Sequence, residues 1–505
     1  MKKILLSSSL LISISIYAQH GVSTNWSPEY VLSKTSPTKD ASKGGTGQNI
    51  IRLSNGDIVQ CFVETPGMAK IYLVKSTTDG TTWNTPVNYS PTLMTNVVSG
   101  PTIAKDTADN IHMVWIRNVP DKAMYYSKMD KDFNVLIDTI RIDNPTIVYN
   151  HAAPYITVDR KMRVHVLWHV GDVDLASTST EFAKVSYVSS NDNGLTWGLQ
   201  KIISDTTSHK HAAFPRANFS GVNSDTLAFP WRQEVVSTTA WDVWIAYSTD
   251  GGATWTRTLA AGTANSEWDP GVVVDKNNRI HLHYHEYQGT SFSNPKIEYA
   301  YSDDLGTTWS PANPFSSISP TSIRSQLSVF AYDFETNLQC ICWKDERDFV
   351  SPIDGNADVM CSFSSDGGIS WQGQEFVTDI DTTELIFKSI EVGSNGILYS
   401  TYEFDDINGK RSIYLRKRNA IVSINELNNT NSSVTVYPNP TNGDVRIILQ
   451  NQNLISTKIY NSIGELIREI YTSEFSISDL PNGLYFLQIQ SNNSTHTSKI
   501  IKNNP

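Results

Sequence analysis

The sequence predicts an all-β protein in which seven four-stranded antiparallel units form a seven-bladed β-propeller, followed by a small C-terminal β-sandwich. Three observations lead to this prediction: a short string ending in Trp recurs along the chain, each repeat has the same order of apolar stretches, and the composition changes after Asn419. The length of 505 residues also points to more than one domain.

The recurring string starts with Ser, carries Asp and Gly in its middle and ends at Trp. Its five copies are residues 76–83, 190–197, 248–255, 302–309 and 364–371. Asp supplies an acceptor and Gly adopts positive φ, so these residues suit a tight hairpin turn, while Trp can cover the hairpin as an apolar plug. We therefore interpret the Asp residues as turn-formers; in the first copy the Asp lies one place later, at Asp79.

This string resembles the Asp box, or bacterial neuraminidase repeat, of sialidase-like β-propellers. In that family the Asp box is structural and lies away from the active site. The resemblance therefore implies a propeller of Asp-box hairpins and says little about which residues carry the chemistry.

The spacing of the Trp residues sets the number of units. Successive Trp residues are 114, 58, 54 and 62 positions apart, and the first step is close to two ordinary ones, so one copy should have decayed near residue 140. First strands are then expected to begin near Gly47, Gly100, Ala153, Ala213, Asp269, Gln326 and Lys388. The seventh unit has only three strands, and residues 26–35 are expected to supply the fourth and remove the open edges. Sialidases proper have six blades, so the chain departs from them in this respect.

Both ends of the chain carry export signals. Residues 1–19 have the form of a signal peptide, with Lys2 and Lys3 before an apolar run. No later stretch is long and apolar enough to span a membrane, which predicts a soluble, exported chain. A net charge of −11 without a basic face argues against nucleic-acid binding.

The C-terminal segment contains Y-P-N-P at 437–440, L-P-N-G-L-Y at 480–485 and K-I-I-K at 499–502. It resembles the C-terminal sorting domain of the type IX secretion system of Bacteroidetes. The resemblance implies passage across the outer membrane, a partnership with the type IX machinery, and either release or attachment at the cell surface. The expected organisation is a signal peptide (1–19), a propeller (20–420), a linker (421–433) and a sorting domain (434–505).

Topology places a candidate site at one face of the propeller. The start of each first strand and the end of each second strand share a face, opposite the Asp boxes, and loops at such a face commonly carry function. The candidate catalytic residues at this mouth are His169, Arg232, His285, Glu286 and Asp269. The candidate substrate-binding residues are Arg117, His151, His211, Trp268, Arg324 and Lys344.

Other reactive side chains have simpler explanations. His112, His165 and His281 recur at one repeat position, which indicates packing. His281, His283 and His285 have a spacing that could hold a metal, but the repeat already explains His281, so no metal and no cofactor is expected. Cys340, Cys342 and Cys361 fall on neighbouring strands and could either pair or remain buried thiols; their spacing is not a zinc pattern.

Three functions fit these residues. In a sialidase-like glycosidase, Arg117, Arg232 and Arg324 would hold a carboxylate, Glu286 and Asp269 would act as acids, and Tyr287 is nearby. The F/Y-R-I-P motif of that family is absent, and F-P-R-A at 214–217 is only an echo of it.

A polysaccharide lyase would use Arg232 or Lys344 to neutralise a uronate and His169 or His285 as the base, with Trp268 and Trp241 stacking on a sugar. A non-catalytic adhesin or binding propeller would use the same mouth without turnover. In each case the expected partner is an extracellular glycan or glycoprotein.

Overall fold

The structure is a computed structural model that falls into two compact units, Met1–Ile421 and Val422–Pro505. The residues that it describes are 23, 25–33, 40–42, 47–65, 70–89, 98–117, 122–147, 150–171, 183–204, 211–215, 225–235, 240–288, 293–314, 325–346, 358–378, 388–393, 396–405, 410–418, 434–449, 453–461, 466–492 and 495–503. The predicted signal peptide and Arg324 lie outside these residues. Every regular element in the described part of the chain is a strand, and this part contains no apolar helix of membrane-spanning length.

The described strands of the first unit form seven antiparallel sheets. Sheet 1 consists of β2 (Asp40–Ser42), β3 (Ile50–Arg52), β4 (Ile58–Thr65), β5 (Lys70–Ser76) and β6 (Val87–Asn88), and sheet 2 of β7 (Val98–Lys105), β8 (Ile111–Arg117), β9 (Ala123–Met129) and β10 (Val135–Arg141). Sheet 3 consists of β11 (His151–Val158), β12 (Val164–Val170), β13 (Lys184–Ser190) and β14 (Lys201–Ile202), sheet 4 of β15 (Ala212–Ala213), β16 (Leu227–Glu234), β17 (Trp241–Ser248) and β18 (Thr256–Ala261), and sheet 5 of β19 (Ser266–Val274), β20 (Ile280–Gln288), β21 (Ser293–Ser302) and β22 (Asn313–Pro314). Sheet 6 consists of β23 (Ser325–Tyr332), β24 (Gln339–Asp345), β25 (Asp358–Ser364) and β26 (Gln372–Phe376), and sheet 7 of β27 (Lys388–Val392), β28 (Leu398–Asp405), β29 (Arg411–Arg418) and β1 (Tyr30–Val31).

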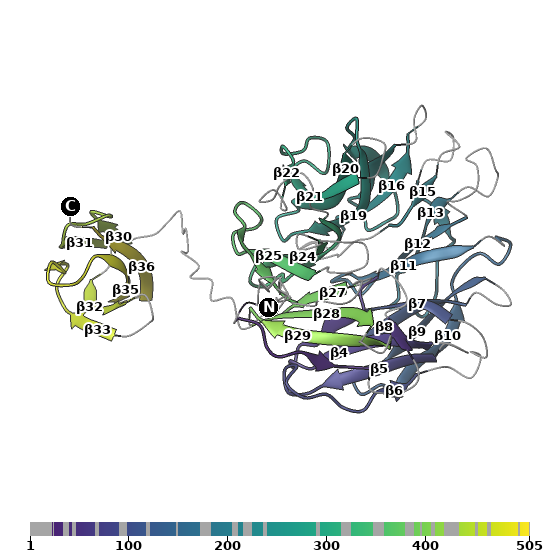
Figure 1. The fold of residues 1–505 in the computed structure, drawn as a ribbon, viewed down its shortest axis with the longest axis horizontal. Coiled ribbons are helices and arrows are strands. Elements are labelled where there is room, and N and C mark those ends of the chain that lie inside the picture. Colours follow the sequence, from purple (N-terminus) through teal and green to yellow (C-terminus); the bar gives the residue numbers. More distant parts are fainter. Residues whose placement is uncertain are drawn as a thin grey trace, which may run out of the picture. The chain divides into compact units, whose positions relative to one another are not determined.

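The expected N-terminal strand is present. β1 pairs with the last strand of sheet 7, with Tyr30 opposite Leu415. Just before it, Trp26 forms a bridge with Arg418, and its indole N–H donates to Glu375 at 3.1 Å. The first strands β7, β11, β19 and β27 lie toward the middle of the unit, and β6, β10 and β22 lie at its periphery (Figure 1).

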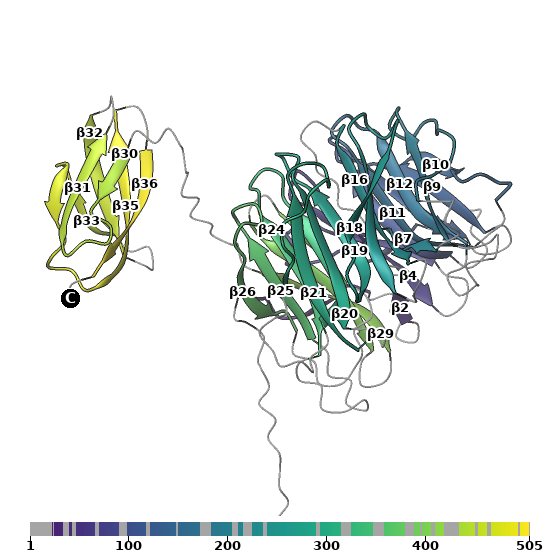
Figure 2. The same cartoon turned by 90° about the horizontal axis from the view of Figure 1, so that it is seen from above.

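Each sheet buries both of its faces against neighbouring sheets, which are seen stacked in Figure 2. One apolar cluster joins each sheet to the next in chain order. A further cluster joins sheet 7 back to sheet 1, with Tyr399 packed among Ile50 and Ile58. Because apolar side chains leave water on both faces of every sheet, each sheet depends on its two neighbours for stability.

The Asp-box turn works as predicted in the copies at 190–197, 248–255, 302–309 and 364–371. In the second of these, Ser248 Oγ accepts the N–H of Gly252 at 2.8 Å, and Asp250 accepts the N–H of Thr254 at 2.9 Å. Gly252 has φ of +89°, which a side chain rarely adopts. The box Trp packs beyond its own hairpin: Trp255 meets Tyr187 of the preceding sheet edge-on, with ring centroids 5.0 Å apart.

The first copy departs from the prediction. Thr78 takes the place of the turn-forming Asp and accepts the N–H of Thr82 at 2.8 Å. Asp79 instead accepts a hydrogen bond from Lys417 at 2.8 Å and one from Tyr399. The interpretation of Asp79 as a turn-former was therefore wrong, because its shifted position directs its carboxylate toward sheet 7. The decayed copy in sheet 2 keeps an Asx turn, in which Asp130 accepts the N–H groups of Asp132 and Asn134 at 2.9 Å.

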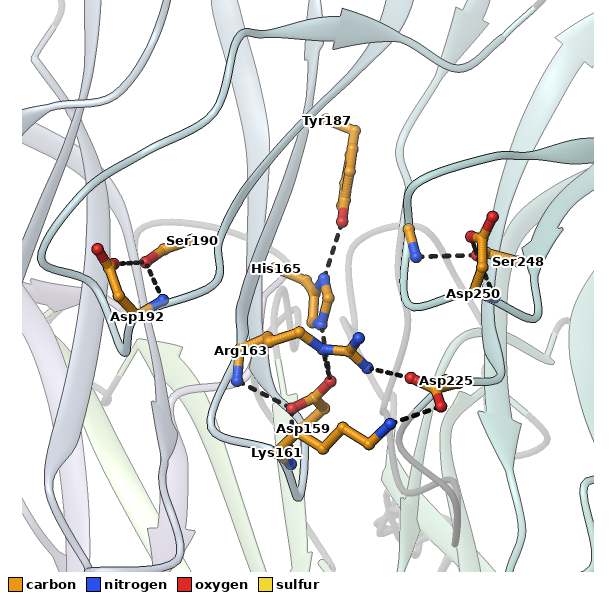
Figure 3. Close-up of polar contacts among 11 residues, drawn as sticks. Asp159, Lys161, Arg163, His165, Tyr187, Ser190, Asp192, Asp225, Ser248 and Asp250 are labelled. Atoms are coloured by element: carbon orange, nitrogen blue, oxygen red, sulfur yellow. Dashed lines mark hydrogen bonds and ion pairs between the residues drawn. The ribbon is translucent and has the colours of Figure 1, made fainter.

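Below the Asp boxes a buried polar chain recurs in three sheets. In sheet 3, Asp159 lies 3.3 Å from Nε2 of His165, whose Nδ1 lies 2.8 Å from the hydroxyl of Tyr187 (Figure 3). Burial raises the pKa of Asp159, but the hydrogen bond from His165 holds it below its usual value. The ionised Asp159 therefore accepts from Nε2–H, and the Tyr187 hydroxyl must donate to Nδ1.

The same chain is formed by Asp106, His112 and Tyr126 in sheet 2 and by Asp275, His281 and Tyr299 in sheet 5. All three His side chains are fully buried. These three His residues therefore pack inside the sheets, as their recurrence in the sequence predicts.

The second unit is described by itself. Its strands form one sheet of β30 (Val434–Tyr437), β31 (Asp444–Leu449) and β34 (Glu474–Ser476), and another of β32 (Leu454–Tyr460), β33 (Leu466–Ile470), β35 (Gly483–Ser491) and β36 (Thr495–Lys502). The two sheets share one apolar core that contains Val445, Ile459 and Leu487.

Candidate functional site

Arg232, near the end of β16, is surrounded by aromatic rings. Its guanidinium carbon lies 3.7 Å from the ring centroid of Trp268, 4.3 Å from that of Phe214 and 4.7 Å from that of Trp241. The residue is only 5% exposed. A cation held among three rings is stabilised by their quadrupoles, and its N–H donors lie in the guanidinium plane.

Further rings extend this arrangement across sheets 3, 4 and 5. His169 lies 4.9 Å from Phe214, and His211 lies 6.3 Å from Trp241. On the other side, Tyr287 lies 5.6 Å from Trp268 and 5.1 Å from His285. We call the connected set the arginine–aromatic cluster; its members are His169, His211, Phe214, Arg232, Trp241, Trp268, His285 and Tyr287.

Backbone irregularities at the start of the first strands position this cluster. Phe214 and Asp269 have positive φ values of 54° and 45°, and the pairing of β19 with β20 shifts between Trp268 and Gly271. A Cβ on Gly271 would lie 2.1 Å from His283 Nε2, so only glycine fits there. Bulges of this kind re-aim side chains and are frequent beside functional sites. The predicted catalytic residue Asp269 thus lies at the bulge itself and is 8% exposed.

Two glutamates on β19 and β20 share a single threonine. Glu267 and Glu286 are directly opposite each other in the sheet. Thr263 Oγ1 lies 2.6 Å from Glu267 Oε1 and 3.1 Å from Glu286 Oε1. Asn265 donates its side-chain N–H to Glu286 at 3.0 Å and its backbone N–H to Thr263 Oγ1 at 3.0 Å.

The protons in this group can be counted. The Thr263 hydroxyl has one hydrogen and can donate to only one carboxylate. Thr263 donates its hydroxyl hydrogen to Glu267 Oε1 at 2.6 Å and its backbone N–H to the same oxygen at 3.1 Å. Burial raises the pKa of Glu267 to about 7, although these two hydrogen bonds lower it. We call Glu267, Thr263 and Glu286 the carboxyl relay.

The second carboxyl oxygen of Glu267, Oε2, takes no part in these contacts. The side chain is fully buried, and among the described residues Oε2 has no hydrogen-bond partner. A buried polar atom without a partner is rare in folded proteins. A carboxylic acid kept neutral near pH 7 beside a second carboxyl group is an arrangement suited to general acid–base chemistry.

The remaining predicted site residues lie elsewhere. Arg117 stacks on Tyr125 within sheet 2, 4.6 Å from its ring centroid. His151 Nε2 lies 3.2 Å from Asp143. Lys344 pairs with Glu346 at 3.0 Å in sheet 6.

The structure therefore brings His169, His211, Arg232, Trp268 and His285 together in the cluster and Glu286 into the relay, and it places Arg117, His151 and Lys344 in contacts of their own sheets or loops. The prediction missed Glu267 and Thr263. A signal for Glu267 was present, because it directly precedes Trp268 at the start of a first strand.

One group of described side chains has the spacing of metal ligands, and it lies outside this site. It consists of Cys340, Cys342 and Cys361 in sheet 6. In the cluster, the imidazole of His169 is tilted by 60° against the ring of Phe214, and that of His285 meets the ring of Tyr287 edge-on, at 85°.

Two segments match known domain families. Residues 143–332 match the BNR repeat-like domain, and residues 435–503 match the secretion system C-terminal sorting domain. Both resemblances predicted from the sequence are confirmed: the chain carries sialidase-like BNR repeats and a type IX sorting domain. The sorting domain indicates secretion to the cell surface or the extracellular space.

Solved structures with a similar fold include glycan-active enzymes. The Hadza microbial sialidase Hz136 has 12% sequence identity and a TM-score of 0.41, over 71% of this chain and 73% of its own. A polysaccharide lyase of family PL25, an ulvan lyase, has 10% identity and a TM-score of 0.49, over 74% of this chain and 93% of its own. A Trypanosoma rangeli sialidase has 12% identity and a TM-score of 0.43, over 79% and 83%. Among curated proteins none matches this sequence.

Proposed function

We propose that residues 20–420 form a seven-bladed β-propeller in which sheets 1–7 are the blades and β1 closes the ring. The seven inter-sheet cores, the last of which joins sheet 7 to sheet 1, support this reading. In the proposed organisation residues 1–19 are a signal peptide, 421–433 a linker and 434–505 a β-sandwich sorting domain handled by the type IX machinery.

We further propose that the chain is a glycosidase-like enzyme that acts on extracellular glycans bearing carboxylates. The observation that carries this proposal is the cage of Arg232 among Phe214, Trp241 and Trp268. Its Trp268 lies on β19, the strand that also holds Glu267 of the carboxyl relay. Aromatic rings stack on sugar faces, and a guanidinium binds a carboxylate through paired N–H donors.

In this mechanism Arg232 orients the sugar carboxylate and Trp268 and Trp241 hold the ring. Glu267, neutral up to about pH 7, donates a proton to the leaving oxygen. Water attacks the sugar carbon as its bond to the leaving oxygen breaks, and Glu286 takes the proton that this water loses. Thr263 lies between Glu286 and Glu267, so its hydroxyl can pass a proton back to Glu267. Protonation of a leaving oxygen by a positioned acid contributes about 10²–10⁴-fold to a rate.

A second candidate, a lyase reaction on a uronate, is favoured by the neighbourhood of His169 and Arg232, which both contact the ring of Phe214. Elimination needs a cation at the carboxylate and a base for the adjacent proton. Arg232 would supply the first and His169 the second.

The test is turnover of a panel of sialosides and uronate-containing polysaccharides by the exported protein. Free sialic acid or new reducing ends without ultraviolet absorbance would support hydrolysis. A rise in the absorbance of unsaturated uronates would support elimination. Binding on a glycan array without any product would contradict both reactions and make the mouth a recognition surface.

A further inference from the structure

Three buried cysteines lie together in sheet 6, in the core that joins it to sheet 7. Cys340 and Cys342 are on β24 and Cys361 is on β25, and all three are fully buried. Their sulfur atoms lie within 4.8 Å of one another. The fourth cysteine of the chain, Cys61, is also buried, in sheet 1.

The register singles out one pair among the three. Cys342 and Cys361 are directly opposite each other in the antiparallel pair β24–β25. Val359 directs both its N–H, to Thr378, and its C=O, to Val377, away from β24. Because these directions alternate along a strand, Cys361 also directs its backbone groups away from β24. Cys342 and Cys361 thus form a non-hydrogen-bonded pair, whose Cα atoms are about 4.5 Å apart, within the range of about 4.4–6.8 Å that a disulfide spans.

The surroundings favour a neutral product over a metal–thiolate site. The thiols lie among Val359, Ile390 and Leu398, where thiolates would be buried without solvent. Arg418 is the nearby cation, and it already binds Glu375 through two hydrogen bonds of 2.8 and 2.7 Å. A disulfide adds no charge to this core.

The compartment to which the protein is exported provides the oxidising conditions that a disulfide needs. The sorting domain indicates secretion, and disulfides form and persist in exported proteins. We propose that Cys342 and Cys361 form a disulfide during export and that Cys340 remains a thiol beside it. This proposal rests on export and is independent of any activity on glycans.

The reaction balances with a protein disulfide of the thiol-oxidase class as oxidant. Attack by one thiolate on that disulfide gives a mixed disulfide, and the second cysteine displaces the oxidase, which leaves as a dithiol. Two electrons and two hydrogens pass from the cysteines to the oxidase. Burial raises the pKa of the Cys340 and Cys361 thiols, so the exchange takes place before sheets 6 and 7 close over them, and the product is then shielded from reductants.

The test compares one sequence in two oxidation states. The full chain is exported with its signal peptide, and a second batch is made without it in a reducing cytosol. After unfolding in an alkylating reagent, mass spectrometry should count two modifiable thiols in the exported protein and four in the cytosolic one. The exported protein should also melt a few degrees higher, because the link restricts its unfolded state.

Single cysteine variants identify which two residues form the disulfide. Cys340→Ala should keep the cross-link, Cys342→Ala should abolish it, and Cys61→Ala serves as the matched buried control, with the link retained. Four thiols in the exported protein would overturn the proposal. So would a link that uses Cys340 or Cys61, or one metal ion per chain held by intact thiols.

Discussion

At the scale of single residues, burial changes the proton affinity of one glutamate in a group of three side chains. Thr263 lies within hydrogen-bond distance of both Glu267 and Glu286, and desolvation raises the pKa of Glu267 to about 7. Glu267 is therefore the side chain that can give up a proton near neutrality, and Glu286 is its partner. Two carboxyl groups of the same chemical type obtain different roles from their surroundings.

Glu267→Gln should lower kcat by about 10²–10⁴-fold on the substrate found in the panel, because the amide has no acidic proton. The wild-type rate should fall as pH rises through about 7, where Glu267 loses its proton, and this limb should be missing from the residual activity of the variant. The measurement is kcat between about pH 5 and pH 9. A variant that keeps the wild-type profile would remove Glu267 from the reaction.

Stability provides the control for this variant. The pKa of Glu267 is raised in the folded state, so the protonated form stabilises the fold at low pH and this contribution is lost as pH rises through about 7. Glutamine stays neutral at every pH. At about pH 8, Glu267→Gln should therefore melt no lower than the wild type, which separates lost chemistry from lost folding.

Arg232→Lys should weaken glycan binding at least about 10-fold while keeping the charge, because an ammonium neither stacks among three rings nor offers paired donors. Binding of the panel glycan by calorimetry measures the effect. The matched control is Arg279→Lys: Arg279 also stacks on a ring, that of Tyr301, at 4.2 Å. If Arg232→Lys and Arg279→Lys lose glycan binding equally, the loss reflects a general effect on stability and not a contact between Arg232 and the glycan.

At the scale of the elements, each Asp-box hairpin fits into the sheet before it. Tyr187 donates to His165, and a Cβ on Gly252 of the next hairpin would lie 2.2 Å from the Tyr187 hydroxyl (Figure 3). Lys161 and Arg163 reach Asp225 of the next sheet at 2.6 and 2.9 Å. The repeat string is therefore the outer part of a contact that runs between sheets.

A double-mutant cycle tests this contact. Tyr187→Phe should cost about 1–3 kcal/mol, because Nδ1 of the buried His165 loses its donor. Gly252→Ala should cost more, through both the clash and its φ of +89°. In the double variant the hydroxyl that clashes with the new Cβ is gone. The loss of unfolding free energy in the double variant should therefore be smaller than the sum of the losses in the two single variants, by about 1 kcal/mol or more. Full additivity in urea unfolding would contradict the contact.

The contrast between sequence and structure follows from the range of the interactions. The turn of the box is local, so Ser, Asp and Gly predict it, and recurrence of His112, His165 and His281 predicts their packing. The role of Asp79 depends on Lys417, 338 positions away, which no local pattern contains. Five of the residues predicted for the mouth lie in one cluster, and strand direction was the signal that grouped them. The raised pKa of Glu267 could not be predicted from the sequence, since it arises from burial of the side chain in the folded protein.

At the scale of the whole molecule, the last sheet of the first unit packs against the first sheet. Sheet 7 combines the first described strand with the last strands of its unit, and its core with sheet 1 holds Leu32 and Tyr399. Removing residues 23–33 should expose the edge of β29 and the cores on both sides of sheet 7. We expect a lower melting temperature and self-association through the open edge.

Thermal melting and light scattering check this expectation. Removal of residues 434–505 is the matched control, because the second unit has its own core, and this truncation should leave the melting temperature of the first unit unchanged. If removal of residues 23–33 has no more effect than the control truncation, β1 does not close the ring.

The measurement that tests the central claim most directly is the position of a bound glycan on the molecule. Glu267→Gln, which should bind without turnover, would be crystallised with an oligosaccharide that the wild type converts. The account predicts a sugar ring against Trp268 and Trp241, its carboxylate on Arg232 and its glycosidic oxygen toward residue 267. A glycan bound at the face of the Asp boxes, with the arginine–aromatic cluster untouched, would contradict the account.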